Sequence, residues 1–191
     1  MRFFFSLLFI LLVKSSFASV VGEDGLHKPD WLQLTFKDLR EDLEEAHSND
    51  KRFFIIFEQR GCIYCKKMHE EVFSDPKISK LIAKKFYVVQ MNLFGDEEVT
   101  DFDSETLTEK EMAIKWGVHF TPTIMFFPLE SDVFEPANLA AVVTMPGAFS
   151  KYTTFNLLNF ILEEGYNGSE HFQKYHSRKY LEKKNSKQPQ E

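Results

Sequence analysis

Cysteine is scarce in this chain: Cys62 and Cys65 are the only two among 191 residues. A single close pair excludes a small fold held together by several disulfides. As a structural staple, the pair would close too short a loop to remove much entropy from the unfolded chain. A zinc site made of both cysteines, His69 and His119 stays an alternative, although no second Cys/His cluster follows at finger spacing.

The sequence also lacks the charge pattern or motifs of several other classes of protein. The formal net charge is −6 and the pI is about 5.6, so the composition gives no basis for binding nucleic acid. The sequence contains neither a glycine-rich phosphate loop nor a G-x-S-x-G nucleophile setting. Lys66 directly follows the second cysteine, where attachment of a c-type haem requires histidine. We therefore expect no cofactor, no metal and no nucleic-acid partner.

The long apolar run of this chain lies at its N-terminus, from Phe3 to Val13. It ends at Lys14, well short of the roughly 20 apolar residues that span a membrane. The small residues Ser16 and Ala18 fit a signal-peptidase site. We expect a signal peptide over residues 1–18, cleaved after Ala18, and an exported, periplasmic protein. An uncleaved membrane anchor is the alternative.

The rest of the chain is most simply one domain with extensions at its ends. Residues 19–29 are polar and contain glycine, which predicts a mobile leader. Residues 30–166 carry periodic apolar patterns and are expected to form the folded domain. Residues 167–191 are rich in Lys, Asn and Gln and are expected to form a polar C-terminal tail that begins with a short helix.

The two cysteines stand three residues apart, just after the apolar run Phe53–Phe57. Such a run predicts a buried strand, and a Cys-x-x-Cys at the start of the following helix is typical of redox sites. Residues i and i+3 are neighbours on a helix, so two sulfurs at this spacing can form a bond. The helix N-terminus favours a thiolate at Cys62, which we predict to be the nucleophile. Cys65 is then the resolving thiol.

The order of predicted elements places this pair in an α/β fold. A helix over about 35–47, the strand 53–57, a helix over 62–72 and a strand over 87–92 follow one another. Asp75-Pro76 interrupts the helical stretch between the two strands. A strand–helix–strand order of this length predicts a parallel crossover.

The second half of the chain adds an acidic insertion, a helix and a strand. Residues 94–108 carry several acids and no base, so they predict a solvated acidic loop; the Asp101-x-Asp103-x-Glu105 pattern leaves calcium as the alternative. Further elements are expected as a helix at 109–116, an apolar strand opened by Thr121-Pro122, a strand at 140–145 and a helix at 150–164.

This combined pattern resembles the thioredoxin superfamily over roughly residues 30–165. Within it, the chain is similar to exported SoxW-type proteins, which share Cys-x-x-Cys-Lys, an acidic insertion like 99–103 and the Trp-Gly-Val-x-x-Thr-Pro-Thr of 116–123. The resemblance implies a thioredoxin-like fold, a mixed central sheet flanked by helices with a cis-proline loop. It also implies that Pro122 is cis and lies against the active disulfide.

The resemblance further implies a substrate surface. The backbone at Thr121 would pair with a substrate strand beside Pro122, and Ile63 and Tyr64 between the cysteines would contact the substrate. Tyr64 as a simple cover of the helix N-terminus is the alternative.

The sequence departs from thioredoxins at the position of their buried acid, where it has Ile56. Glu58, His69 or water are candidates to replace it in proton transfer from the resolving thiol.

We therefore expect an exported thiol–disulfide oxidoreductase that reduces disulfides in periplasmic partner proteins. It would need no cofactor, act as a monomer and receive electrons from a membrane donor. The alternatives are a disulfide-donating oxidase or isomerase, and a redox-inactive binding module on the same fold.

Overall fold

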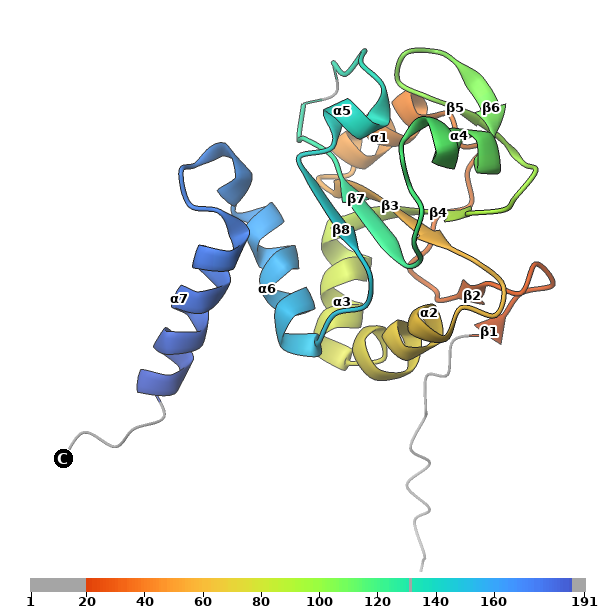
Figure 1. Ribbon diagram of the computed structural model, residues 1–191. Coiled ribbons are helices and arrows are strands. Elements are labelled where there is room, and N and C mark those ends of the chain that lie inside the picture. The colour runs from red at the N-terminus through yellow and green to blue at the C-terminus, as the bar shows by residue number, and fades with distance from the viewer. Residues whose placement is uncertain (1–19, 131, 187–191) are drawn as a thin grey trace, which may run out of the picture.

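A central four-stranded sheet organises the computed structural model, which describes residues 20–130 and 132–186. The strand order is β4-β3-β7-β8. The signal peptide expected over 1–18, residue 19 and residues 187–191 of the tail lie outside the described residues, and those predictions remain untested. Figure 1 shows helices on both sides of the sheet, as expected of a thioredoxin-like α/β fold.

The two central strands confirm the predicted parallel crossover. Strand β3 (Arg52–Glu58) pairs in parallel with β4 (Phe86–Asn92), and Arg52 lies opposite Phe86. The chain between them forms α2 (Ile63–Lys67), the π-helical turn η1 (Met68–Phe73) and α3 (Pro76–Lys85). Asp75 caps α3 by accepting a hydrogen bond from the amide of Lys77, so the predicted interruption separates two helical segments.

The first helix starts later than its apolar spacing predicted. Helix α1 spans Leu39–Ser48, with Asp38 as N-cap, and Lys37 has a positive φ of 57°. Leu34 and Phe36 therefore lie outside the helix, fully exposed at 101% and 97%. The prediction of a helix from 35 was wrong because the aspartate cap and the left-handed residue before it outweigh the apolar periodicity.

The antiparallel half of the sheet follows a short helix. Helix α4 (Glu109–Lys115) leads through Gly117 to β7 (Thr123–Phe126), which pairs antiparallel with β3. Gly117 has a φ of 68°, the left-handed conformation in which a glycine commonly ends a helix. The one-turn helix α5 (Ala137–Ala140) then precedes β8 (Val143–Pro146), which pairs with β7 and starts later than predicted.

The C-terminal region extends the packed fold beyond the expected boundary at 166. Helix α6 (Lys151–Leu162) packs on the sheet and continues through η2 (Gly165–Asn167) to α7 (Phe172–Asn185). The rings of Phe160 and Tyr175 are in edge contact, and Tyr175 is buried. Most of the region predicted as a polar tail is therefore a helix, which lies outside α6 in Figure 1.

The N-terminal segment, predicted as a mobile leader, contains short strands. Val20–Val21 (β1) pair with His27–Lys28 (β2), and the following Leu32 pairs in parallel with Val88 at the edge of β4. Leu26 and Trp31 are buried. Figure 1 shows this hairpin beside α2.

The sheet divides the core into two clusters because side chains alternate along β3. Phe53, Ile55 and Phe57 face the cluster under α1, α4 and α5. Phe54 and Ile56 face the cluster under η1, α3 and α6. All five are essentially fully buried, which agrees with the uniformly apolar run that predicted a covered central strand. Across the described ranges, no helix is both long and apolar enough to cross a membrane.

Candidate functional site

The Cys-x-x-Cys motif lies at the start of α2, which follows β3 after a short loop. Gly61 adopts a positive φ of 73°, which glycine tolerates best, and turns the chain so that Cys62 becomes the N-cap of the helix. The sulfur of Cys62 accepts a hydrogen bond from the amide of Cys65 at 3.0 Å. This sulfur therefore faces the unpaired N–H groups of the helix N-terminus, which stabilise negative charge.

The two cysteines form a disulfide, with an S–S distance of 2.15 Å and Cα atoms 5.2 Å apart. Cys62 is partly exposed, whereas Cys65 is 1% exposed. The residues between them, Ile63 and Tyr64, are 70% and 58% exposed. An incoming thiol or disulfide can therefore reach Cys62 but not Cys65, which is the division expected of a nucleophile and a resolving thiol.

A second wall of the site comes from the turn before β7. The Thr121–Pro122 peptide bond is cis, which confirms that prediction. The hydroxyl of Thr121 donates to the sulfur of Cys62 at 3.3 Å, and the carbonyl oxygen of Thr121 lies 3.5 Å from that sulfur. Segments 59 residues apart in the sequence thus meet at one atom.

The residues predicted for the site are consequently brought together in one place. Thr121 contacts the sulfur of Cys62, Pro122 follows it in the cis turn, and Ile63 and Tyr64 are exposed between the two cysteines. Lys66 is different: its side chain is largely exposed, and its amine lies 3.7 Å from Glu70. It is a solvated helix residue.

A buried polar network lies beneath the active-site helix. The carboxylate of Glu58 is 2.7 Å from Nε2 of His69 and accepts a hydrogen bond from the side-chain amide of Gln90 at 2.5 Å. Glu58 and His69 are only 1% and 3% exposed. His69 follows Cys65 by four residues, so the two side chains lie on the same face of the helical segment. The network therefore lies on the face of this segment that carries Cys65.

These contacts bring together two of the candidates for replacing the missing acid at Ile56. Ile56 itself is buried in the apolar core. The sequence pointed to Glu58 and His69 separately, but Gln90 was missed. Gln90 could have been recognised as a polar residue between the apolar Val89 and Met91 of β4. The π-helical turn that contains His69 is a feature often found at functional sites.

The N-terminal hairpin covers this network from outside. The amide of Gln90 also donates to the carbonyl of His27 at 2.8 Å, and the amine of Lys28 donates to the Gln90 side chain at 2.6 Å. The rings of His27 and His69 are stacked, with centroids 4.4 Å apart. Burial, reinforced by the nearby His69, lowers the pKa of His27.

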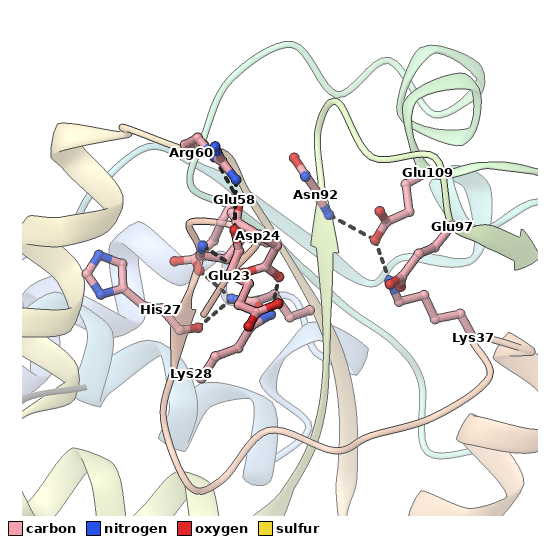
Figure 2. A network of polar contacts seen from close by, with 12 residues as sticks. Glu23, Asp24, His27, Lys28, Lys37, Glu58, Arg60, Asn92, Glu97 and Glu109 are labelled. Atoms are coloured by element: carbon pink, nitrogen blue, oxygen red, sulfur yellow. Dashed lines mark hydrogen bonds and ion pairs between the residues drawn. The ribbon is translucent and has the colours of Figure 1, made fainter. Parts of the chain in front are cut away.

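Arg60 ties the same hairpin to the loop before Cys62. Its guanidinium donates to the carbonyls of Glu23 at 2.8 Å and Asp24 at 3.2 Å, and Asp24 pairs with Lys28 at 2.5 Å. Figure 2 shows these side chains grouped around Glu58, between β3 and the N-terminal segment. The segment expected to be a leader therefore packs on the site.

A separate ion cluster fixes the insertion on the other side of β4. Lys37 pairs with Glu97 and Glu109, each at 2.5 Å, and Glu109 also accepts the backbone amide of Asn92 at 3.0 Å. Figure 2 shows this group apart from the one around Glu58. It anchors the chain before α1 to the end of β4.

The acidic insertion is not the solvated loop that its composition predicted. Strands β5 (Glu98–Thr100) and β6 (Thr106–Thr108) form a hairpin, and Asp101 between them is fully buried. The amine of Lys115 lies within 3.0 Å of Asp101, Asp103 and Glu105.

The ammonium of Lys115 thus occupies the position considered for calcium. Its pairing, against the opposing effect of burial, raises the pKa of Lys115. Within the described residues, no group of three or more His, Cys, Asp or Glu side chains is arranged to hold a metal ion.

Comparisons with known proteins agree with this geometry. A comparison with curated proteins gave no significant match. A thioredoxin-fold protein from Helicobacter pylori aligns in structure with a TM-score of 0.52 and 19% identity, covering 79% of this chain and 97% of its own. A thioredoxin from Thermus thermophilus aligns with a TM-score of 0.52 and 23% identity, covering 67% of this chain and 86% of its own.

At these identities the structural neighbours support the fold alone. The family described as the thioredoxin-like domain matches residues 39–136, which is just over half of the chain and includes both cysteines and the cis-proline turn. The chain therefore belongs to the thioredoxin-like domain family.

Proposed function

We propose that this protein is an exported thiol–disulfide oxidoreductase of the SoxW type that reduces disulfides in periplasmic partner proteins. The observation that carries the proposal is the Cys62–Cys65 disulfide at a helix N-terminus, with the sulfur of Cys62 facing Thr121 beside the cis-proline. The apolar run at residues 3–13 supports export.

The reaction follows from the different exposure of the two sulfurs. In the reduced protein, the Cys62 thiolate attacks a substrate disulfide, forms a mixed disulfide and releases one substrate thiolate. The Cys65 thiolate then attacks the Cys62 sulfur and releases the second substrate thiolate, which leaves the protein disulfide described above. Two electrons pass to the substrate, and the two substrate thiolates take up the protons lost by the cysteines.

The surroundings of Cys62 suit protein substrates. Ile63 and Tyr64 in the first turn of α2, and Phe120 just before Thr121, are large exposed apolar side chains. Backbone groups at Thr121 are available to an extended substrate segment, as in strand addition. A membrane protein that passes electrons across the inner membrane would restore the dithiol.

Two cysteine variants test the proposal. Cys62→Ser should abolish reduction of insulin disulfides, and Cys65→Ser should accumulate mixed disulfides with partner proteins, because the second step is removed. Insulin reduction that persists in Cys62→Ser would rule out the proposed mechanism.

The reduction potential then decides the direction. A value near that of thioredoxin, about −270 mV, supports a reductant, and a value near that of DsbA, about −120 mV, would instead support a disulfide donor.

A further inference from the structure

A groove of about 460 Å³ opens beside the disulfide, between helix α2 and the loop that follows β8. Tyr64 and Lys67 line one wall, and Gly147 and Lys151 line the other. The amide of Gly147 donates to the carbonyl of Pro122 at 2.7 Å, so the second wall is bonded directly to the cis-proline turn. The groove therefore adjoins the turn whose Thr121 contacts the sulfur of Cys62.

The charges on the two walls favour an anion between them. Lys67 makes no ion pair within residues 20–130 and 132–186, and the partner of Lys151, Asp75, is 3.7 Å away. Glu71 is the one acid among the lining residues. Lys67, which has no ion pair in this part of the chain, thus faces Lys151, whose pairing with Asp75 is long, although the whole chain has a net charge of −6.

The groove also has room for a side chain. Gly147 has a positive φ of 97°, and a Cβ at this position would meet no atom within 4 Å. The wall opposite Tyr64 is therefore open at the point nearest Pro122, and the phenol ring of Tyr64 offers a flat apolar surface on the other side.

We propose that this groove selects protein substrates with an acidic residue close to the reactive cysteine. The inference rests on the proposed function. The carboxylate would lie between Lys67 and Lys151 while the substrate sulfur is bonded to Cys62. Lys67 and Lys151 would act as specificity-determining residues, with no part in the sulfur chemistry.

The test uses disulfide-linked peptides that differ only in one residue two positions from the cysteine, which is Glu, Gln or Lys. The rate constant for their reduction by the reduced protein is measured at low ionic strength, where the Debye length is about 30 Å. Exposed ion pairs are weak, so we expect each of the two lysines to make the Glu peptide react about two- to fivefold faster than the Gln peptide. The Lys peptide should react slowest.

Charge reversal identifies the groove. Lys67→Glu and Lys151→Glu should remove or invert the preference, whereas Lys84→Glu should keep it. Lys84 is an exposed residue of α3 at the end of the sheet opposite Cys62, so it controls for the change in net charge. Added salt should weaken the preference in the unmodified protein.

An uncharged small disulfide, 2-hydroxyethyl disulfide, separates the two proposals. If the protein reduces it but the three peptides react equally, or if the Lys67 and Lys151 variants keep the Glu preference, the groove inference is wrong and the proposed function stands. If neither this compound nor any peptide is reduced, the proposed function fails, and the inference fails with it.

Discussion

Glu58→Ala is expected to destabilise the protein strongly, because this carboxylate is the centre of the buried network under the active-site helix. It accepts hydrogen bonds from His69 at 2.7 Å and from Gln90 at 2.5 Å, and it is 1% exposed. Hydrogen bonds to a charged group contribute about 1.5–3 kcal/mol each, so the two together contribute roughly 3–6 kcal/mol.

Glu58→Gln is the matched variant. The glutamine carbonyl can still accept from Gln90, and its amide can donate to Nε2 of His69 if the imidazole proton moves to Nδ1. Because both contacts then survive in neutral form, we expect a loss of only about 1 kcal/mol. The difference between the two variants isolates the cost of leaving His69 and Gln90 without a partner.

Urea unfolding of the oxidised protein measures these values, with Glu44→Ala as an exposed control expected to change the free energy of unfolding by less than about 0.5 kcal/mol. Since a domain of this kind is stable by about 5–15 kcal/mol in total, the alanine variant should be visibly weakened. A loss below about 1 kcal/mol in Glu58→Ala would refute the view that this carboxylate holds the network together.

The same pair of variants tests whether the network serves the chemistry. If Glu58 and His69 accept the proton of Cys65, Glu58→Gln should slow the resolution of a mixed disulfide at Cys62, with an altered pH profile, while stability is nearly kept. General bases typically contribute about 10²–10⁴-fold. An unchanged rate and pH profile in Glu58→Gln would assign the network a structural role alone.

Two further predictions concern titrating groups outside the site. Burial raises the pKa of Asp42 to about 7, whereas the unfolded chain titrates near about 3.9. The native state therefore holds more protons between these values, and the free energy of unfolding should fall as the pH rises from about 4 to about 7. Asp42→Asn should flatten that fall in urea titrations, and an unchanged slope would contradict it. Lys115→Met, which leaves three carboxylates without their cation, should cost about 2–4 kcal/mol near pH 7. The exposed pair of Lys110 gives the control, because Lys110→Met should cost far less than Lys115→Met, and equal losses in the two variants would argue against the buried cluster.

Elements with strong local signals were predicted well. The run Phe53–Phe57 indicated a covered central strand, and the strand that follows the crossover was placed within one residue. The resemblance supplied the cis-proline at Pro122. These predictions succeeded because apolar pattern and proline position report on burial and backbone geometry directly.

Predictions that depended on long-range partners were wrong or incomplete. The insertion after β4 has an acidic composition, yet Asp101 is buried because Lys115, distant in the sequence, provides the countercharge. The polar N-terminal segment packs on the site because Gln90 and Arg60 bind its carbonyl groups. Composition alone cannot show such pairings, since the partners lie on other elements.

The sequence by itself determined the chemistry available to this protein, because only two cysteines exist and their spacing allows one bond. It also determined the strands that carry them, through apolar runs that must be buried. Only the tertiary structure decided which sulfur is accessible, since exposure depends on how α2 packs against the Thr121–Pro122 turn. It alone brought the candidates Glu58 and His69 together with Gln90, because the three side chains meet only when both central strands and the helix are in place.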